Sequence, residues 1–240
     1  MQEDIKLEHI LFLDIETVGA VKSYNQLDEK MKSFWDKKSD KIKKDSESSA
    51  EDIYRMAGIY AEFGKVVCIS VAFLKNGLLR IKSFADNDER RLLLEFAELL
   101  NTYFSKSFHR LCAHNGKEFD FPYLCRRMLI NGISIPFVLN ATGKKPWETN
   151  FLDTLELWKF GDYKHYTSLD LLASIFNIPS PKDDIDGSMV HDIYWGNNDL
   201  SRITEYCERD VLTVVQLYMR YNGLEQLSED KVVFVGSAAN

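Results

Sequence analysis

The segment that most constrains this chain is an apolar run, ILFLDIET, which carries two acidic residues in its second half. The run from Ile10 to Leu13 leads into an alternating pattern, which predicts a buried β-strand whose side chains change face at every residue. Asp14 and Glu16 therefore point the same way. Two such carboxylates repel each other and lose water, which costs several kcal/mol per ion unless a cation or proton compensates. The strand predicts a divalent metal site.

Two other segments carry acidic residues that can join this pair. Tyr206 and Asp210 are four residues apart in LSRITEYCERDVLTVVQLYMRY, whose apolar residues recur at helical spacing, so they share one helix face. A tyrosine hydroxyl one turn before a metal-binding carboxylate can hold an attacking water. In AHNGKEFDF, Asn115 is expected to cap a helix that has Asp120 in its first turn. The third segment can thus reach the cluster from another direction.

Each segment alone also fits a structural role. An Asp-x-Glu pair is more often a strand end or a salt-bridge pair without metal, and Asp120 can simply complement a helix dipole. Tyr206 with Asp210 fits any amphipathic helix. The conjunction of all four carboxylates and the tyrosine favours a nuclease site that uses two metal ions.

The ordered set DIET, HNxxxFD and YxxxD resembles the DEDDy branch of the DEDD 3′-5′ exonucleases, whose proofreading members belong to DNA polymerases. The resemblance spans residues 10–221 and is greatest to the exonuclease domain of family B polymerases, including the stretch SLDLLASIFNIPSPKDDIDGSMV. It implies a ribonuclease H-like fold. It also implies hydrolysis of phosphodiester bonds at a 3′ end.

The resemblance assigns a role to each motif residue. Asp14, Glu16 and Asp210 would ligate one metal ion, and Asp14 would bridge to a second, on which Asp120 would act mainly through water. Tyr206 would orient the nucleophile, in place of the histidine of the sister branch. The residues expected to contact or frame the 3′-terminal nucleotide are Thr17, His114, Asn115 and Phe119. For His114, a structural role is the alternative.

Oxygen ligands select Mg²⁺ or Mn²⁺, and two ions fit the chemistry, since one generates the nucleophile and the other neutralises the leaving 3′ oxygen. The five histidines are scattered and form no zinc motif. The net charge of −7 is unusual for a nucleic-acid enzyme. Part of that charge belongs to the proposed metal site. The expected binding of short single strands is therefore weak and sensitive to salt.

A chain of 240 residues with 45% hydrophobic content can form one substantial core, so we expect a single domain over 1–240. The four cysteines form no CxxC pair and are expected to be reduced and mostly buried. No signal peptide and no apolar run of about 18 residues is present, which predicts a soluble, intracellular (cytoplasmic) protein without a membrane partner.

The expected fold is α/β, a mixed sheet flanked by helices. A charged segment at about 22–61 follows the first strand as an insertion, with helical spacing in 27–35 and 50–63 and a loop at 37–50 between them. Its aromatic residues more often pack inward than stack on bases. KVVCISVAF and LLRIKSFA predict a hairpin around Asn76-Gly77, a helix follows over 89–103, and RLCAH predicts a core strand.

Later elements are less regular. Asp153 and Ser168 are expected to cap the helices that follow them, which is why Asp153 is left out of the metal site. Lys182, Asp183 and Asp184 lie in a polar loop that can face the substrate. The tail beyond Ser228 is expected to be an edge strand or a disordered end.

The function predicted from the sequence is a metal-dependent 3′-5′ exonuclease acting on single-stranded ends, with DNA favoured over RNA. An exoribonuclease that trims RNA 3′ ends, a catalytically silent nucleic-acid-binding module and a hydrolase of small phosphoesters remain as alternatives. A chain of 240 residues has no room for a polymerase, so a proofreading or DNA-repair role would need separate partners.

Overall fold

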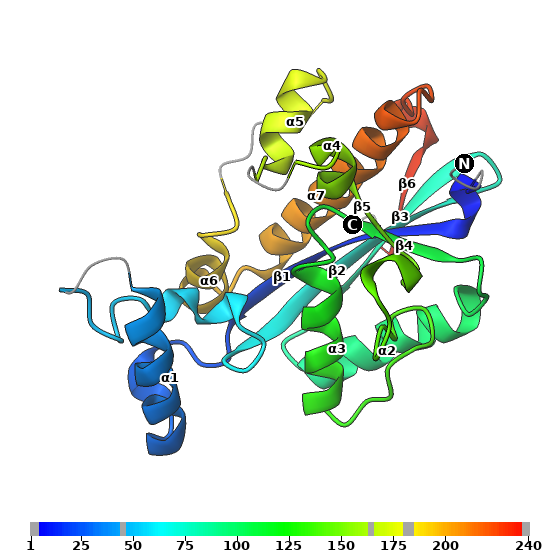
Figure 1. The fold of residues 1–240 in the computed structure, drawn as a ribbon. Helices are drawn as coiled ribbons and strands as arrows, with labels where there is room; N and C mark the ends of the chain where they lie inside the picture. Colours follow the sequence, from blue (N-terminus) through cyan, green and yellow to red (C-terminus); the bar gives the residue numbers. More distant parts are fainter. Residues whose placement is uncertain (1–4, 44–46, 163–165, 180–184, 237–240) are drawn as a thin grey trace.

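A six-stranded mixed sheet forms the centre of the computed structural model, which describes residues 5–43, 47–162, 166–179 and 185–236 (Figure 1). The strand order is β5-β4-β1-β2-β3-β6. β1–β2 and β2–β3 are antiparallel pairs, and β4–β1, β5–β4 and β6–β3 are parallel pairs. The strands are β1 (Ile10–Gly19), β2 (Gly64–Lys75), β3 (Leu78–Ala85), β4 (Arg110–Ala113), β5 (Phe151–Asp153) and β6 (Val232–Val235).

Helices cover both faces of the sheet, which confirms the predicted α/β class (Figure 1). The helices are α1 (Glu29–Ile42), α2 (Glu89–Tyr103), α3 (Asp120–Ile130), α4 (Thr154–Lys159), α5 (Leu169–Ile175), α6 (Val190–Asp192) and α7 (Leu200–Tyr221). Shorter helical segments are Leu7–His9, Tyr24–Gln26, η3 (Tyr54–Ile59), Pro146–Glu148, Ile193–Asn197 and Glu229–Lys231.

The alternation along β1 decides which side chains face which helices. Leu11, Leu13 and Ile15 belong to a core with buried residues of α2 and α3. Ile10 and Phe12 belong to a second core, with buried residues of α7 on the opposite face. Asp14 and Glu16 continue the second row, because side chains two residues apart on a strand share a face. The sheet thus directs both carboxylates toward α7.

The hairpin predicted around Asn76-Gly77 is confirmed. Both residues have positive φ angles, 54° and 76°, as a tight two-residue turn between antiparallel strands requires. Helix α2 covers the predicted range, and the Asp88 side chain caps it by accepting hydrogen bonds from the N–H groups of Arg90 and Arg91. The segment beyond Ser228 forms β6, an edge strand beside β3. Of the two expectations for the tail, the edge strand is the one that the structure shows.

The segment after β1 differs from the prediction in two places. Helix α1 continues to Ile42, through the first part of the predicted loop, because it buries Trp35 and Ser39 on one side while its lysines remain at the surface or half-buried. The second predicted helix, over 50–63, is instead the short 3₁₀ segment η3 with flanking turns. Its Gly58 approaches β1 so closely that an added Cβ would lie 3.0 Å from Cα of Val18.

A small core of its own holds this segment together. The Trp35 ring lies 5.4 Å from that of Tyr54 and 5.2 Å from that of Phe63, and its Nε1–H donates to the carbonyl of Ala50 at 2.7 Å. Tyr24 and Tyr60 pack against the same cluster, whereas Phe34 is exposed. Most of the aromatic side chains therefore pack inward, as expected.

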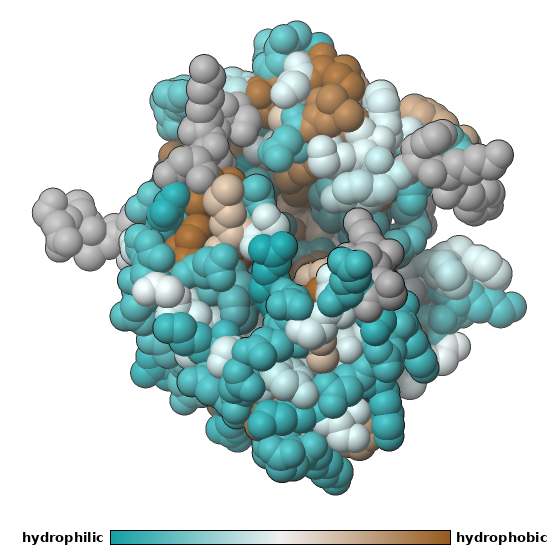
Figure 2. All heavy atoms as spheres, turned by 90° about the vertical axis from the view of Figure 1, so that its left-hand side faces the viewer, coloured by the Kyte–Doolittle hydropathy of each residue, from teal (hydrophilic) through white to brown (hydrophobic). Residues whose placement is uncertain are grey.

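The surface on the side of the molecule that faces left in Figure 1 is mostly hydrophilic, with apolar patches mainly in the upper half of the view in Figure 2.

Cys68, Cys112 and Cys207 are buried and Cys125 is half-buried, all as free thiols. Among the described residues, no helix combines the length and apolar character that crossing a membrane requires.

Candidate functional site

Asp14 and Glu16 lie side by side on β1, beneath the helix α7. Their carboxylate oxygens and the sulfur of Cys207, on α7, all lie within 4.8 Å of one another. The Cys207 thiol donates to the backbone carbonyl and to Oδ2 of Asp14, both at 3.4 Å. Glu16 is only 7% exposed. Two carboxylates are therefore held in one small, largely buried space.

The structure brings the other two predicted carboxylates to the same place. Burial raises the pKa of Asp14 well above its usual range, and the nearby charges of Asp210 and Asp120 raise it further. The pKa of Glu16 is raised in the same way, first by burial and then by Asp14, Asp210 and Asp120. Residues from β1, α3 and α7 thus form one cluster of like charge.

Asp120 enters the cluster from the first turn of α3. It is 4% exposed, and burial raises its pKa to about 7 although the N–H groups of Ile15 and of Asp120 itself stabilise the charged form. The contact with Ile15 follows from the sheet topology. β4 pairs with β1 only at Ile10 to Phe12, so beyond Phe12 the edge of β1 is open on that side. Asp120 fills part of this open edge.

Tyr206 lies one turn before Asp210 on α7, with both side chains on one face as predicted. Burial and then the charges of Asp210, Glu16 and Asp14 raise the pKa of Tyr206 strongly, and a hydrogen bond to the Asp210 carboxylate contributes in the same direction. The hydroxyl therefore stays protonated. It is a donor placed at the carboxylate cluster.

The donor set fits a divalent cation. Among the described residues, Asp14, Glu16 and Asp120 have no Lys or Arg partner within 4.0 Å. Uncompensated buried carboxylates are unfavourable unless protons or cations neutralise them. Burial raises the pKa of the adjacent Cys207 thiol, which keeps it protonated as the hydrogen-bond donor. The available ligands are thus carboxylate oxygens, the set that Mg²⁺ and Mn²⁺ prefer.

The residues predicted to contact the 3′-terminal nucleotide are near this cluster in sequence, but their side chains make different contacts from one another in the structure. Thr17 is half-buried and shares a hydrogen bond with the Tyr123 hydroxyl. Phe119 is also half-buried, directly precedes Asp120 and packs against the ring of Tyr123, with 5.3 Å between centroids. Both side chains keep part of their surface open to solvent.

His114 has contacts that support the structural alternative. Its Nδ1 lies 2.9 Å from Oγ1 of Thr154, and its Nε2 lies 2.9 Å from the carbonyl oxygen of Thr167. Burial lowers the pKa of His114, which favours the neutral ring. Both nitrogens are therefore engaged in holding β4 to later segments.

The prediction that Asn115 caps a helix is wrong. Helix α3 begins at Asp120, and the residue before it, Phe119, makes no side-chain cap. Asn115 instead has a positive φ of 60°, and its carbonyl accepts from the N–H groups of Glu118 and Phe119. Asparagine tolerates this left-handed conformation better than most residues, which explains its place in the turn.

Asp153 has a larger role than the sequence indicated. It caps α4 as predicted, accepting from the N–H groups of Leu155 and Glu156. Its carboxylate also accepts from the N–H groups of Asn115 and Lys117, both at 3.0 Å. The sequence signal for this second role was weak, because it depends on β5 lying beside β4. Asp153 therefore anchors the turn that leads to Asp120. Lys182, Asp183 and Asp184 are outside the described residues.

Comparisons with known proteins show the family and the fold of this chain. Residues 59–233 match the family model described as a predicted 3′-5′ exonuclease related to the exonuclease domain of PolB. The match includes Asp120, Tyr206 and Asp210 and begins after β1. No curated protein matches the chain.

A solved structure shares the fold. The family B DNA polymerase from the hyperthermophilic archaeon Pyrobaculum calidifontis matches with a TM-score of 0.50 and 18% sequence identity. The match covers 88% of this chain and 24% of the polymerase chain, so the chain spans about a quarter of that protein's length. On the family match, which includes well over half of its residues, the chain belongs to the family of predicted 3′-5′ exonucleases related to the exonuclease domain of family B DNA polymerases.

Proposed function

We propose that this protein is a metal-dependent 3′-5′ exonuclease that hydrolyses the terminal phosphodiester bonds of single-stranded nucleic acid, with DNA favoured. The observation that carries the proposal is the convergence of four acidic side chains from β1, α3 and α7 on one buried site. Folding does not require this cluster, because buried carboxylates without a compensating charge destabilise the folded protein.

Asp14, Glu16 and Asp210 would hold one metal ion, and Asp14 would share a second with Asp120. Mg²⁺ or Mn²⁺ bound there would lower the pKa of a water molecule and neutralise the leaving 3′ oxygen. The Cys207 thiol orients Asp14 by donating to its Oδ2. The N–H of Ile15 does the same for Asp120. These bonds hold the carboxylates in place before a cation arrives.

Tyr206 would orient the attacking water. Its hydroxyl is protonated and bonded to Asp210, so it can donate to or accept from a water molecule beside the same carboxylate. Thr17 and Phe119 would frame the last nucleotide, since each is half-buried and directly adjoins a carboxylate of the cluster in sequence, Glu16 and Asp120 respectively. The turn at Asn115 would help to position the last nucleotide. The two hydrogen bonds of His114 would hold that turn in place.

The preference for DNA rests on the likeness to a polymerase exonuclease domain, and an exoribonuclease remains the closest alternative. We also propose that 1–240 is a single exonuclease domain whose insertion at 22–61 is held by its own small core. Its nucleic-acid partner is then a single-stranded 3′ end. A role in proofreading or DNA repair would require a separate polymerase or repair protein.

The proposal is tested with a single-stranded DNA oligonucleotide labelled at its 5′ end, beside its RNA counterpart and a DNA strand whose 3′ end is blocked. We expect a ladder of shortening products from DNA, a slower ladder from RNA and none from the blocked strand. Faster RNA trimming would assign the exoribonuclease. Cleavage of small phosphoesters without any ladder would assign a different hydrolase, and no cleavage of any substrate would favour a silent binding module.

A further inference from the structure

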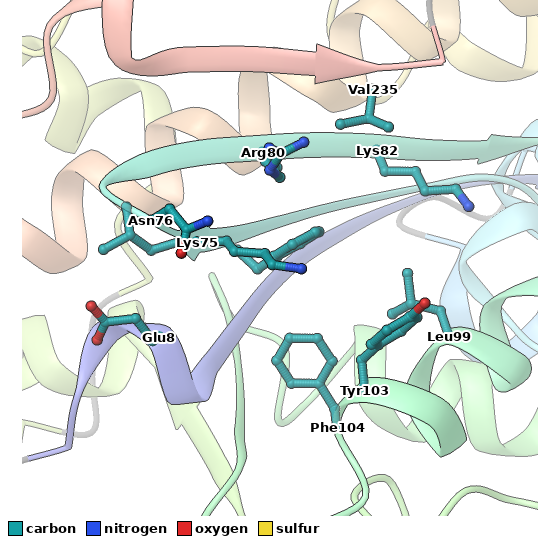
Figure 3. Close-up of a pocket in the computed structure, with 11 residues that line it drawn as sticks. Glu8, Lys75, Asn76, Arg80, Lys82, Leu99, Tyr103, Phe104 and Val235 are labelled. Carbon is teal, nitrogen blue, oxygen red and sulfur yellow. The ribbon is translucent and has the colours of Figure 1, made fainter.

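A cavity on the opposite face of the sheet from Asp14 and Glu16 carries a cluster of cationic side chains (Figure 3). It lies between β3 and the C-terminal end of α2, and the hairpin turn closes one side. Its volume is ≈ 610 Å³, within the range of about 300–1,000 Å³ that small-molecule sites occupy. The metal cluster does not extend into it.

Strand alternation explains why these cations gather there. Leu79 and Ile81 of β3 face α7, so Arg80 and Lys82 face the α2 side. On β2, Phe73 packs into the core beneath α2, and Lys75, two residues later, points to the same side. Figure 3 shows Lys75 and Lys82 reaching toward the space above α2.

Within the described ranges of the chain, these three cations lack carboxylate partners. Among the described residues, neither Lys75, Arg80 nor Lys82 has an acidic group within 4.0 Å. The Arg80 Nε is buried, and the part of the chain that the structure describes gives it no hydrogen-bond acceptor. Lys82 instead lies 4.7 Å from the centre of the Phe84 ring. In a chain with a net charge of −7, the described residues of the lining carry three cations and one carboxylate, that of Glu8, which is a local reversal of charge.

Aromatic rings form the other wall of the cavity. Tyr103 and Phe104 rise from the end of α2 toward β3 (Figure 3), and Tyr103 is 67% exposed. Phe104 is buried against Phe73, with 6.2 Å between ring centroids, so Tyr103 offers the most exposed aromatic ring of the lining. An exposed ring opposite unpaired cations suits a ligand that has both a flat base and a phosphate.

We propose that this cavity binds a nucleoside phosphomonoester, with Arg80, Lys75 and Lys82 on the phosphate and Tyr103 against the base. Three cations against one carboxylate leave an excess of two positive charges, which matches the charge of about −2 on a phosphomonoester better than the single charge of a phosphodiester. The same chemistry occurs in a free mononucleotide and at the phosphorylated 5′ end of a strand. The site is separate from the proposed catalytic cluster, and binding there does not depend on hydrolysis.

The test is calorimetric titration of the full chain with deoxyadenosine monophosphate in the presence of a chelator. Without metal, the carboxylate cluster offers the phosphate no cation to bind, so binding reports on the cavity. We expect binding of one nucleotide per chain, with adenosine and inorganic phosphate each binding at least tenfold more weakly. Equal binding of phosphate and nucleotide would overturn the nucleotide assignment, and no nucleotide binding would overturn the site.

Variants locate the binding. The double variant Arg80→Gln/Lys82→Gln should bind the nucleotide at least tenfold more weakly, since two charge-assisted contacts are lost. Tyr103→Ala should weaken binding of the nucleotide but not of phosphate. Lys37→Gln/Lys41→Gln, which neutralises two exposed lysines of α1, is the charge-matched control. Equal losses in the control and the cavity variant would contradict the proposal. Lys82→Gln alone replaces the double variant if its thermal melting shows that it is unfolded.

A phosphorylated oligonucleotide separates the two sources of the ligand. Tighter binding of a strand with a 5′ phosphate than of the mononucleotide, lost when the phosphate is removed, would identify the strand end. Weaker binding would identify the free nucleotide. Equal binding of strands with and without the phosphate would contradict the choice of a phosphomonoester. Because the chelator prevents hydrolysis, these results stand whether or not the protein is an exonuclease.

Discussion

Asp120 shows how strongly the site depends on protons when no cation is bound. Its pKa of about 7 lies well above the value of about 3.9 expected in an unfolded chain. An acid with a raised folded-state pKa takes up protons on folding, so its stabilising contribution is present at low pH and is lost as pH rises through the folded pKa. Metal-free protein should lose this contribution between about pH 4 and 7.

The variant Asp120→Asn isolates that contribution. With a chelator present, wild type and variant should have similar melting temperatures near pH 4, and the variant should melt higher at pH 8 by several degrees, at about 2–4 °C per kcal/mol for a chain of this size. The histidines titrate in both proteins and cancel in the difference. A difference in melting temperature that is constant with pH, or that favours wild type at pH 8, would show that the charged form of Asp120 does not destabilise the metal-free protein.

Tyr206 provides a second test at the scale of one side chain. Tyr206→Phe removes the hydroxyl bonded to Asp210 and leaves the ring in place. We expect kcat to fall on the order of 10²-fold, the lower range for general acid–base groups, with little change in KM. Tyr218→Phe, on the same helix but in the core beneath it, is the control. Equal effects of the two substitutions would indicate a structural role for Tyr206.

Some residue-level features follow from local sequence and others do not. The strand alternation placed Asp14 with Glu16, and the helical spacing placed Tyr206 with Asp210, because both depend only on neighbours along the chain. The turn at Asn115 was mispredicted because Asp153, thirty-eight residues away in sequence, fixes its backbone. The contact from Cys207 to Asp14 likewise depends on how α7 crosses β1.

At the scale of elements, β1 connects fold and site. It pairs with β2 from Phe12 to Gly19, whereas β4 covers only its first residues, which leaves an open edge where α3 begins. Tyr123 ties α3 to the insertion by donating to the carbonyl of Gly58 at 2.7 Å. The sequence indicated an insertion at 22–61 but not this contact, since helical spacing does not show where a segment packs.

The insertion should unfold separately from the sheet when its own core is removed. Trp35→Ala empties the centre of the cluster formed with Tyr54 and Phe63, at a cost of about 3–5 kcal/mol. Hydrogen exchange should accelerate over α1 and η3 much more than over β1, β2 and β4. Trp147→Ala is the control because that side chain is 76% exposed. Equal acceleration across the sheet would mean that the insertion and the sheet form one cooperative unit.

At the scale of the whole molecule, two regions of opposite charge lie on opposite faces of one sheet. The acidic cluster faces α7, and the cationic cavity lies beside α2. Charge separation of this kind is not visible in a net charge of −7, which averages over both faces. The sequence predicted the acidic cluster through its motifs. It gave no signal for the cavity, because Lys75, Arg80 and Lys82 face it only once β2 and β3 have paired in this register.

The central claim is that acidic residues from three segments act as one metal-dependent site. The most direct measurement is single-turnover cleavage of 5′-labelled single-stranded DNA with Mg²⁺, Mn²⁺ or chelator. Asp14→Asn, Asp120→Asn and Asp210→Asn are compared with wild type and with the exposed control Asp192→Asn. We predict a metal-dependent ladder for wild type and the control, and rates at least 10²-fold lower for the other three variants. Full activity in chelator, or in any of the three variants, would contradict the account.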